Sequence, residues 1–223
     1  MRLFTSTVGR KILMAITGFL MVLFVIVHLL GNSSIFIPGG INAYAEHLHA
    51  LPPMVWAFRV VMLAFLVVHG YYAIQISLEN NAANPKGYAV KRQLKANFAS
   101  ENMIWSGLLI LIFIIGHILH FTARVTPDVA PRVSSLSSGS VFDVFGMVVG
   151  SFQNPVTALL YVAAMIVLFL HLKHGNSSSV QTMGWNNDST LPVIGRIGTI
   201  IAVIFLVGYS SIPLFILTGI LSK

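Results

Sequence analysis

Five long apolar runs dominate the sequence and determine which fold the chain can adopt. Each run approaches or exceeds the roughly 20 residues that a helix needs to cross about 30 Å of bilayer hydrocarbon. Of the 223 residues, 56% are hydrophobic and only 9% are charged, which is too apolar for a soluble domain. The predicted spans cover residues 8–30, 54–78, 103–122, 156–172 and 193–220.

The pattern inside these runs predicts helices rather than strands. A membrane β-barrel strand alternates apolar and polar residues, and these runs are continuously apolar. Arg10 and Lys11 precede the first run as in a secretory signal, but that run is long and no small-residue cleavage site follows it. We therefore expect an all-α membrane protein, a five-transmembrane-helix bundle that forms one integral membrane domain over residues 1–223.

Basic residues predict the orientation of the bundle. Nine of the 13 Lys and Arg residues fall on the side of the amino terminus if the chain crosses five times. By the positive-inside rule that side is cytoplasmic. The net charge of +7 therefore reflects topology, and no nucleic acid partner is expected. These charges form either a solvated collar at the membrane surface or a docking face for a partner protein.

Motifs for other cofactors are missing from the sequence. The chain has no cysteine, which excludes disulfides and thiolate-bound iron–sulfur clusters within it. It has neither a GxGxxG nor a P-loop motif. Nucleotide and flavin binding would therefore belong to a partner.

Four of the five runs carry a histidine late in their length. An ionisable side chain at membrane depth is costly and normally has a functional partner. Because successive helices run in opposite directions, His28 and His117 form an outer pair, while His69 and His171 form an inner pair. Helical rise separates the pairs by roughly 10 to 15 Å. We predict that these four residues are metal ligands of two stacked haem b groups, with two imidazoles for each haem.

Other interpretations of the histidines remain open. A single intramembrane histidine is often a packing residue or part of a proton relay, as in a haem-free transporter or proton channel. Zinc is less favoured, because the chain lacks cysteine and its carboxylates lie outside the apolar runs. His120 and His174 each lie three residues after a predicted ligand, on nearly the same helical face, and are competing ligand candidates. We prefer His117 and His171, because His120 and His174 are expected nearer the membrane surface, where they would bond haem propionates or meet water.

A weak internal repeat relates the first and third runs. Residues 17–28 read TGFLMVLFVIVH and residues 106–117 read SGLLILIFIIGH. Gly18 and Gly107 each precede a histidine by ten residues, or about 15 Å, and so lie near the level of the other haem. We predict that both glycines belong to the cofactor site and let a porphyrin approach the backbone. The alternative is close helix packing.

Haem propionates and a quinone would need polar partners at the membrane surfaces. Glu46 and His47, between the first two spans, are the candidate catalytic residues for quinone proton transfer, and the alternative is a solvated loop. The apolar segment 142–152 is expected to lie flat at the interface. The fifth span has no histidine, and its predicted role is packing, including contact with a second copy. The candidate propionate partners are Arg10, Lys11, Arg92 and His174 inside, and His120 and Arg124 outside.

Five short segments of the sequence resemble motifs of a known protein family. They are SxVGRK at 6–11, HLLGN at 28–32, INAYAEHL at 41–48, NNAANPKGY at 80–88 and, most specific, HLKHGNSSSVQTMGW at 171–185. Over nearly its whole length the chain thus resembles the single-chain, five-helix, dihaem cytochrome b membrane anchor of succinate dehydrogenases and fumarate reductases.

The resemblance implies a respiratory-chain subunit of the bacterial cytoplasmic (inner) membrane. Flavoprotein and iron–sulfur subunits on the cytoplasmic face would interconvert succinate and fumarate, and this chain would have no dicarboxylate chemistry. It would bind two haem b groups and menaquinone or another quinone. The family's axial ligands fall on the same four histidines, with His69 and His171 nearer the iron–sulfur subunit. The alternative is a quinone-reactive dihaem subunit of another dehydrogenase, such as a hydrogenase.

Overall fold

The computed structural model describes residues 4–83, 98–126, 133–134 and 141–222. Five of its helical segments are long and apolar enough to cross a membrane. This confirms the predicted all-α class and the predicted number of long apolar helices. Its elements, in chain order, are α1 (Thr7–Ser33), η1 (Ser34–Phe36), α2 (Gly40–His49), α3 (Pro52–Ala83), α4 (Phe98–Glu101), α5 (Met103–His117), the π-helical turn η2 (Ile118–Thr122), β1 (Val133–Ser134), β2 (Val141–Phe142), α6 (Val144–Phe152), α7 (Pro155–Thr182) and α8 (Leu191–Leu217).

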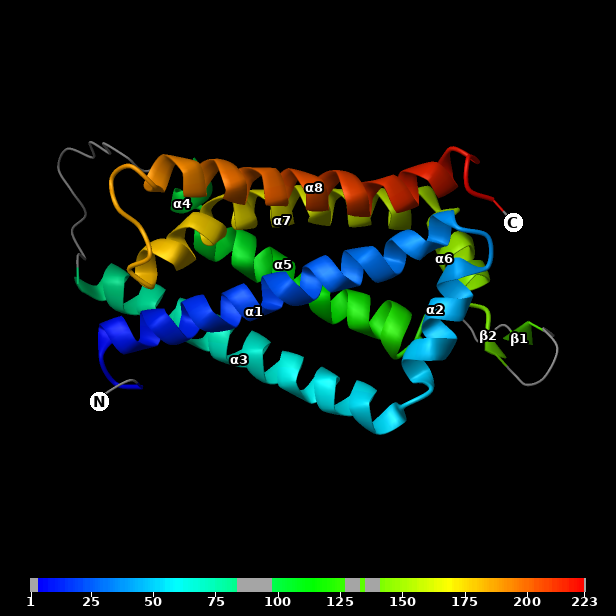
Figure 1. Cartoon of the computed structure of the whole chain (residues 1–223), viewed down its shortest axis with the longest axis horizontal. Helices are drawn as coiled ribbons and strands as arrows, with labels where there is room; N and C mark the ends of the chain where they lie inside the picture. Colours follow the sequence, from blue (N-terminus) through cyan, green and yellow to red (C-terminus); the bar gives the residue numbers. More distant parts are fainter. Residues whose placement is uncertain (1–3, 84–97, 127–132, 135–140, 223) are drawn as a thin grey trace.

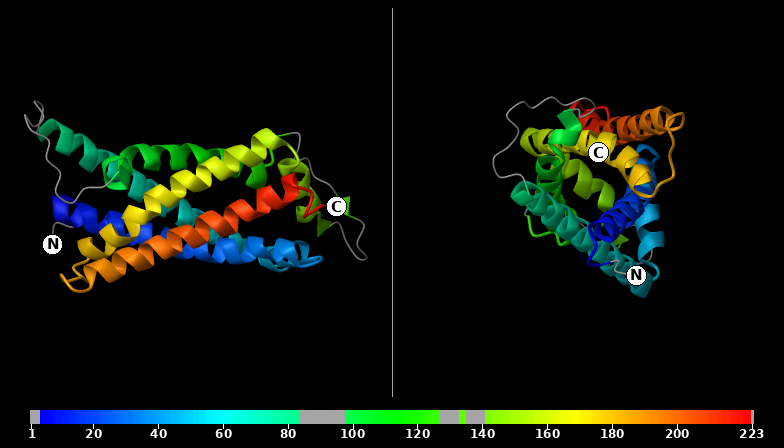
Figure 2. Two further views of the ribbon diagram at one scale, coloured as in Figure 1. Left: turned by 90° about the horizontal axis from the view of Figure 1, so that it is seen from above. Right: turned by 90° about the vertical axis from the view of Figure 1, so that its left-hand side faces the viewer.

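The five long helices run along one another as a bundle (Figure 1). The two termini lie at opposite ends, as an odd number of crossings requires, and we call these ends the N-terminal end and the C-terminal end. Helix α7 packs against α8, α5 and α1, and α1 also packs against α3. Figure 2 shows the same bundle from above and along its length. The short elements α2, α6, β1 and β2 gather at the C-terminal end.

Helix α7 continues well past the predicted end at residue 172 and stops at Thr182. The predicted end was wrong because the apolar run stops at residue 172, whereas the helix continues through polar residues to Thr182. The hydroxyl of Ser177 donates to the carbonyl of His174 at 3.1 Å, and that of Ser179 donates to Gly175 at 2.8 Å. These bonds satisfy the polar side chains within the helix itself.

Helix α8 ends at Leu217, three residues before its predicted limit. Gly219 adopts a positive φ of 77°, and the amide of Leu221 donates back to the carbonyl of Phe215 at 2.9 Å. This left-handed glycine closes the helix in the usual way.

Helix α6 covers the C-terminal end of the bundle instead of lying flat at an interface. Six of its nine residues are buried, and Val149 is 0% exposed. The amide side chain of Asn42 in α2 holds the start of α6. It accepts from the backbone N–H of Phe145 at 2.9 Å and donates to Asp143 at 3.2 Å. The apolar residues of α6, which suggested an interfacial helix, therefore pack in the protein core.

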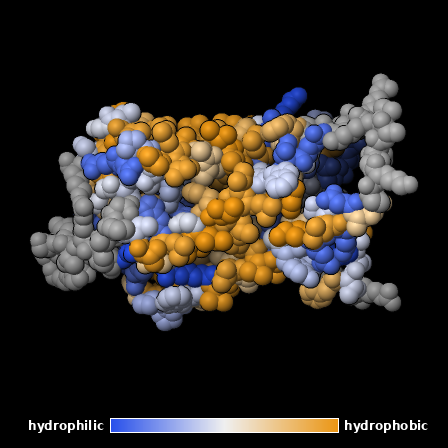
Figure 3. Space-filling model, turned by 180° about the vertical axis from the view of Figure 1, so that it is seen from behind, coloured by the Kyte–Doolittle hydropathy of each residue, from blue (hydrophilic) through white to orange (hydrophobic). Residues whose placement is uncertain are grey.

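The outer surface of the bundle is apolar around its middle. Figure 3 shows hydrophobic residues across the centre of one face and hydrophilic residues toward both ends. Large side chains such as Leu63, Val67 and Tyr71 of α3 point outward, each more than half exposed. Such a band fits a multi-pass membrane protein surrounded by lipid.

Candidate functional site

The four predicted ligand histidines meet as two facing pairs. His28 of α1 faces His117 of α5 with 6.0 Å between the ring centroids and 86° between the ring planes. His69 of α3 faces His171 of α7 at 6.4 Å and 67°. The pairs are those expected from the alternating helix directions. We call His28 and His117 the C-terminal pair, and His69 and His171 the N-terminal pair.

The spacing within each pair fits one metal ion held between two imidazoles. A metal–imidazole nitrogen bond is about 2.0–2.1 Å long and the ring centroid lies roughly 1.15 Å behind that nitrogen, so two opposed ligands place their centroids about 6.3 to 6.5 Å apart. The observed separations of 6.0 and 6.4 Å are close to this span. Two imidazoles supply only two ligands, which suits an iron whose other four ligands come from a porphyrin.

In the N-terminal pair, hydrogen bonds fix which ring nitrogen is free. Nδ1 of His69 lies 2.9 Å from the carbonyl oxygen of Met14. A carbonyl oxygen only accepts, so Nδ1 carries the proton and Nε2 keeps its lone pair for a metal. Nδ1 of His171 lies 3.1 Å from the hydroxyl of Ser106.

The same tautomer follows for His171. The hydroxyl of Ser106 donates its one proton to the carbonyl oxygen of Met103 at 3.0 Å. With its proton on that bond, the hydroxyl accepts from Nδ1–H of His171, which again leaves Nε2 available. Both members of the N-terminal pair thus present the nitrogen that a bis-histidine site needs.

A chain of hydrogen bonds leads from the C-terminal pair to α6. The hydroxyl of Tyr161 lies 3.4 Å from Nδ1 of His117 and 3.0 Å from Nδ1 of His120. Nε2 of His120 lies 2.8 Å from the hydroxyl of Ser151. His120 is buried in the turn η2 with both ring nitrogens bonded to Tyr161 and Ser151, while His117 faces His28. Sequence reasoning missed Tyr161 and Ser151, because nothing near them in the chain marks them.

A groove opens between α5 and α7 next to this hydrogen-bonded chain. Its volume is about 730 Å³, and most of its wall is apolar. The polar groups in the wall come from the C-terminal half of the groove. They are His117, His120, Thr126, Asn154, Thr157 and Tyr161.

Gly18 and Gly107 lie at the level of the N-terminal pair, as their spacing predicted. A Cβ on Gly18 would lie 3.0 Å from Cε1 of His69, and a Cβ on Gly107 would lie 3.3 Å from Cε1 of His171. Each glycine therefore leaves space for the imidazole ring of a neighbouring helix. The approach of a porphyrin to these glycines stays a prediction.

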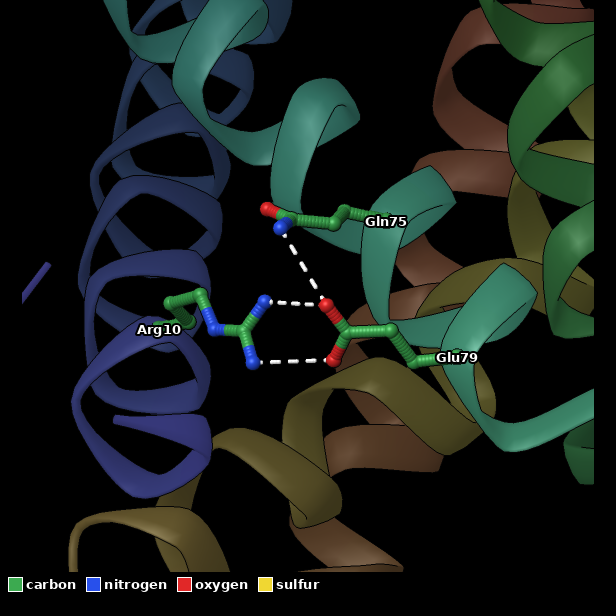
Figure 4. A network of polar contacts seen from close by, with 3 residues as sticks. All are labelled: Arg10, Gln75 and Glu79. Atoms are coloured by element: carbon green, nitrogen blue, oxygen red, sulfur yellow. Dashed lines mark hydrogen bonds and ion pairs between the residues drawn. The ribbon is translucent and has the colours of Figure 1, made fainter. Parts of the chain in front are cut away.

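Arg10 is engaged in an ion pair at the N-terminal end. Its guanidinium makes two bonds to the carboxylate of Glu79 in α3, at 2.6 and 2.8 Å, and Gln75 donates to the same carboxylate at 3.2 Å (Figure 4). Arg10 was predicted to contact a propionate, and here its charge is balanced by Glu79. The sequence signal that could have revealed this is Glu79, the one acidic residue of α3, near the end of that helix.

The other predicted polar residues are dispersed. Lys11 is exposed, His174 is half-buried one turn beyond His171, and Arg92 lies outside the described residues. Glu46 and His47 are exposed on α2 at the C-terminal end, and neither is among the residues of the groove wall.

Arg124 follows η2 at the C-terminal end in a left-handed conformation, with φ of 55°. Burial, and then the charge of Arg59, lower the pKa of Arg124 below its ordinary value. Arg59 and Arg124 thus lie close enough to interact at the C-terminal end, and of these two the sequence singled out only Arg124.

No group of three or more His, Cys, Asp or Glu side chains that could hold a metal occurs in the described parts of the chain. The histidines come in twos, so the arrangement does not suit a zinc site built from protein ligands alone. Comparisons with models of protein families, with curated proteins and with solved structures found no match to this chain.

Proposed function

We propose that this chain is the dihaem cytochrome b membrane anchor of a succinate:quinone oxidoreductase or quinol:fumarate reductase. The observation that carries the proposal is the pair of facing imidazoles at each of two levels, 6.0 and 6.4 Å apart. The sequence segments that resemble this family support it independently.

In this proposal the four histidines hold two haem b groups, and the bound haems supply one-electron transfer between the two ends of the bundle. Each pair of imidazoles would supply two protein ligands to the bound iron, which would suit an electron relay and disfavour oxygen chemistry. The helices keep water away from both levels and fix the ligand pairs at their separation. The cytoplasmic (inner) membrane is the proposed location, with the N-terminal end on the cytoplasmic side.

The quinone is proposed to bind in the groove between α5 and α7. A quinone needs an apolar path for its ring and tail and hydrogen-bonding groups at its oxygens. The groove combines apolar walls with His120 and Tyr161, beside the ligand His117. Glu46 and His47 are exposed on α2 at the same end, where they would exchange protons with water.

The flavoprotein and iron–sulfur subunits are proposed to dock at the N-terminal end. The excess of basic residues predicted on that side supports this choice. Electrons would then enter or leave through the N-terminal pair. A dihaem subunit of a hydrogenase or another dehydrogenase would have the same bundle, so the partner must be identified directly.

The test is to purify the complex from native membranes through a tag on this chain. We expect copurified flavoprotein and iron–sulfur subunits, b-type absorption bands and quinone-dependent interconversion of succinate and fumarate. Copurification of hydrogenase or formate dehydrogenase subunits instead would identify the alternative dehydrogenase. Absence of b-type bands in the reduced-minus-oxidised spectrum would refute both and favour a haem-free transporter.

A further inference from the structure

The internal repeat extends beyond the residues noticed in the sequence. Helix α1 contains Met14, Thr17 and Gly18, and α5 contains Met103, Ser106 and Gly107 at identical spacing. The hydroxyl residue of each set precedes a predicted ligand histidine by 11 residues. Eleven residues turn a helix through about three full turns, so the hydroxyl and the histidine share one face, about 16 Å apart.

In α1 this short stretch holds the ring of His69. The carbonyl oxygen of Met14 lies 2.9 Å from Nδ1 of His69. The hydroxyl of Thr17 lies 3.1 Å from the same carbonyl oxygen and 2.8 Å from that of Leu13. Gly18 leaves room for the edge of the same ring, since its Cβ would lie 3.0 Å from Cε1 and 3.1 Å from Nδ1.

In α5 the equivalent stretch holds the ring of His171. The hydroxyl of Ser106 donates to the carbonyl oxygen of Met103 and lies 3.1 Å from Nδ1 of His171. Gly107 takes the place of Gly18, with its Cβ position 3.3 Å from Cε1 of the ring. The same three parts therefore recur, namely a methionine carbonyl, a hydroxyl within 3.1 Å of it and a glycine under the imidazole.

We infer that residues 14–18 and 103–107 are two equivalent histidine seats, which fix the tautomer and the ring position of His69 and His171 so that Nε2 of each faces the metal position. This inference rests on the proposed function, because it concerns how the chain prepares its N-terminal haem site. Helices α1 and α5 then each contribute to both haem sites. Each provides one histidine ligand to the C-terminal site and one seat, which holds a histidine of the N-terminal site.

The two levels differ in how their ligands are held. His28 stacks on Phe24 of its own helix, with ring centroids 5.2 Å apart, and His117 reaches Tyr161 only at 3.4 Å. The seat residues contact His69 and His171, whereas Tyr161 contacts His117 and His120. Damage to a seat should therefore affect the N-terminal haem alone.

The experiment uses the full-length chain purified from membranes in which it is made with haem. Gly18→Val and Gly107→Val place bulk against the seated rings. Each should reduce the haem content from two toward one per chain, because partners that orient a metal-bound histidine typically contribute 10 to 100-fold in affinity. Haem per chain is measured from the pyridine haemochrome spectrum. The ferric low-spin EPR signals identify the remaining haem by comparison with His171→Ala and His117→Ala.

Matched controls separate this effect from general disruption. Gly70→Val alters a glycine next to His69 whose Cβ position meets nothing within 4 Å, so both haems should remain. Gly198→Ala creates a contact of 2.9 Å with Asn176 between α7 and α8, away from the seats, and should also leave two haems. Ser106→Ala adds no bulk and should weaken retention of the N-terminal haem about tenfold, with Ser106→Thr restoring it.

The outcomes distinguish the inference from the proposed function. Two haems in the unaltered chain and selective loss of the N-terminal signal in both valine variants support the seats. The seats are refuted if the unaltered chain holds two haems and Gly18→Val, Gly107→Val and Ser106→Ala either keep both EPR signals or lose both equally. This result would leave the proposed function intact. An unaltered chain without haem overturns both.

Discussion

The imidazoles of His28 and His117 face one another across the C-terminal end of the bundle, with ring centroids 6.0 Å apart and planes 86° apart. His69 and His171 repeat this arrangement at the other level, although they come from different helices. Two unrelated packing accidents would not be expected to produce the same spacing. The recurrence favours one chemical requirement at both levels, which is two imidazoles around one metal ion.

Loss of any one ligand should remove one haem and leave the other. His69→Ala should yield a chain with one haem, since a single remaining imidazole cannot complete the six-coordinate site. The haem-to-chain ratio measures this, and His28→Ala should give the same ratio with the other EPR signal missing. His49→Ala is the control, because His49 is an exposed histidine of α2 whose Nδ1 bonds to the carbonyl of Ala45 in the same helix. Retention of two six-coordinate haems in His69→Ala would rule out His69 as a ligand.

The hydroxyl of Tyr161 should affect only the C-terminal level. Tyr161→Phe removes the group that lies between His117 and His120, and leaves a buried ring nitrogen of His120 without that partner. We expect a loss of stability of about 1–3 kcal/mol and a shifted midpoint potential of one haem. Redox titration and thermal unfolding in detergent measure the two effects. Tyr71→Phe, on the exposed face of α3, should change neither, and equal shifts of both haems in Tyr161→Phe would contradict the assignment.

The ion pair between Arg10 and Glu79 should couple α1 to α3 at the N-terminal end. Arg10→Ala and Glu79→Ala should each lower the thermal unfolding midpoint, and the double variant should lose less than the sum of the two. The reason is that either single change leaves the other charge without its partner, and Arg10 is buried. Lys11→Ala is the control at an exposed neighbouring position. Strict additivity would show that the two side chains do not interact.

Asn42 should hold α6 over the C-terminal end. Asn42→Ala removes an acceptor for the N–H of Phe145 and a donor to Asp143, and should destabilise α6 by about 1–3 kcal/mol. Hydrogen–deuterium exchange of residues 144–152 is the measurement, with faster exchange expected there. Asn81→Ala, at the exposed end of α3, is the matched control. Unchanged exchange in α6 would mean that its apolar contacts alone hold it.

The sequence predicts the spans and the histidine pairs because both follow from local periodic properties. Continuous hydrophobicity marks a helix that crosses a bilayer, and alternating directions place His28 with His117. Neither inference requires knowing which helix packs against which. The depth of Gly18 and Gly107 follows from helical rise in the same way.

Other features depend on tertiary contacts and could not be predicted. Beyond residue 172, α7 packs against α8, where Asn176 donates to the carbonyl of Gly198 at 3.1 Å, and the start of α6 is bonded by Asn42, more than 100 positions away in the chain. The partnership of Arg10 with Glu79 likewise joins distant segments. The contact of Gly18 with the ring of His69 also joins distant segments, and the sequence did not predict it.

The most direct test is the haem content and iron coordination of the purified full-length chain. The pyridine haemochrome spectrum and the ferric EPR spectrum of one sample should give two haem b groups per chain, both low-spin with two nitrogen axial ligands. A chain with no haem, with one haem, or with a high-spin five-coordinate iron would contradict the claim that the two histidine pairs are bis-imidazole haem sites.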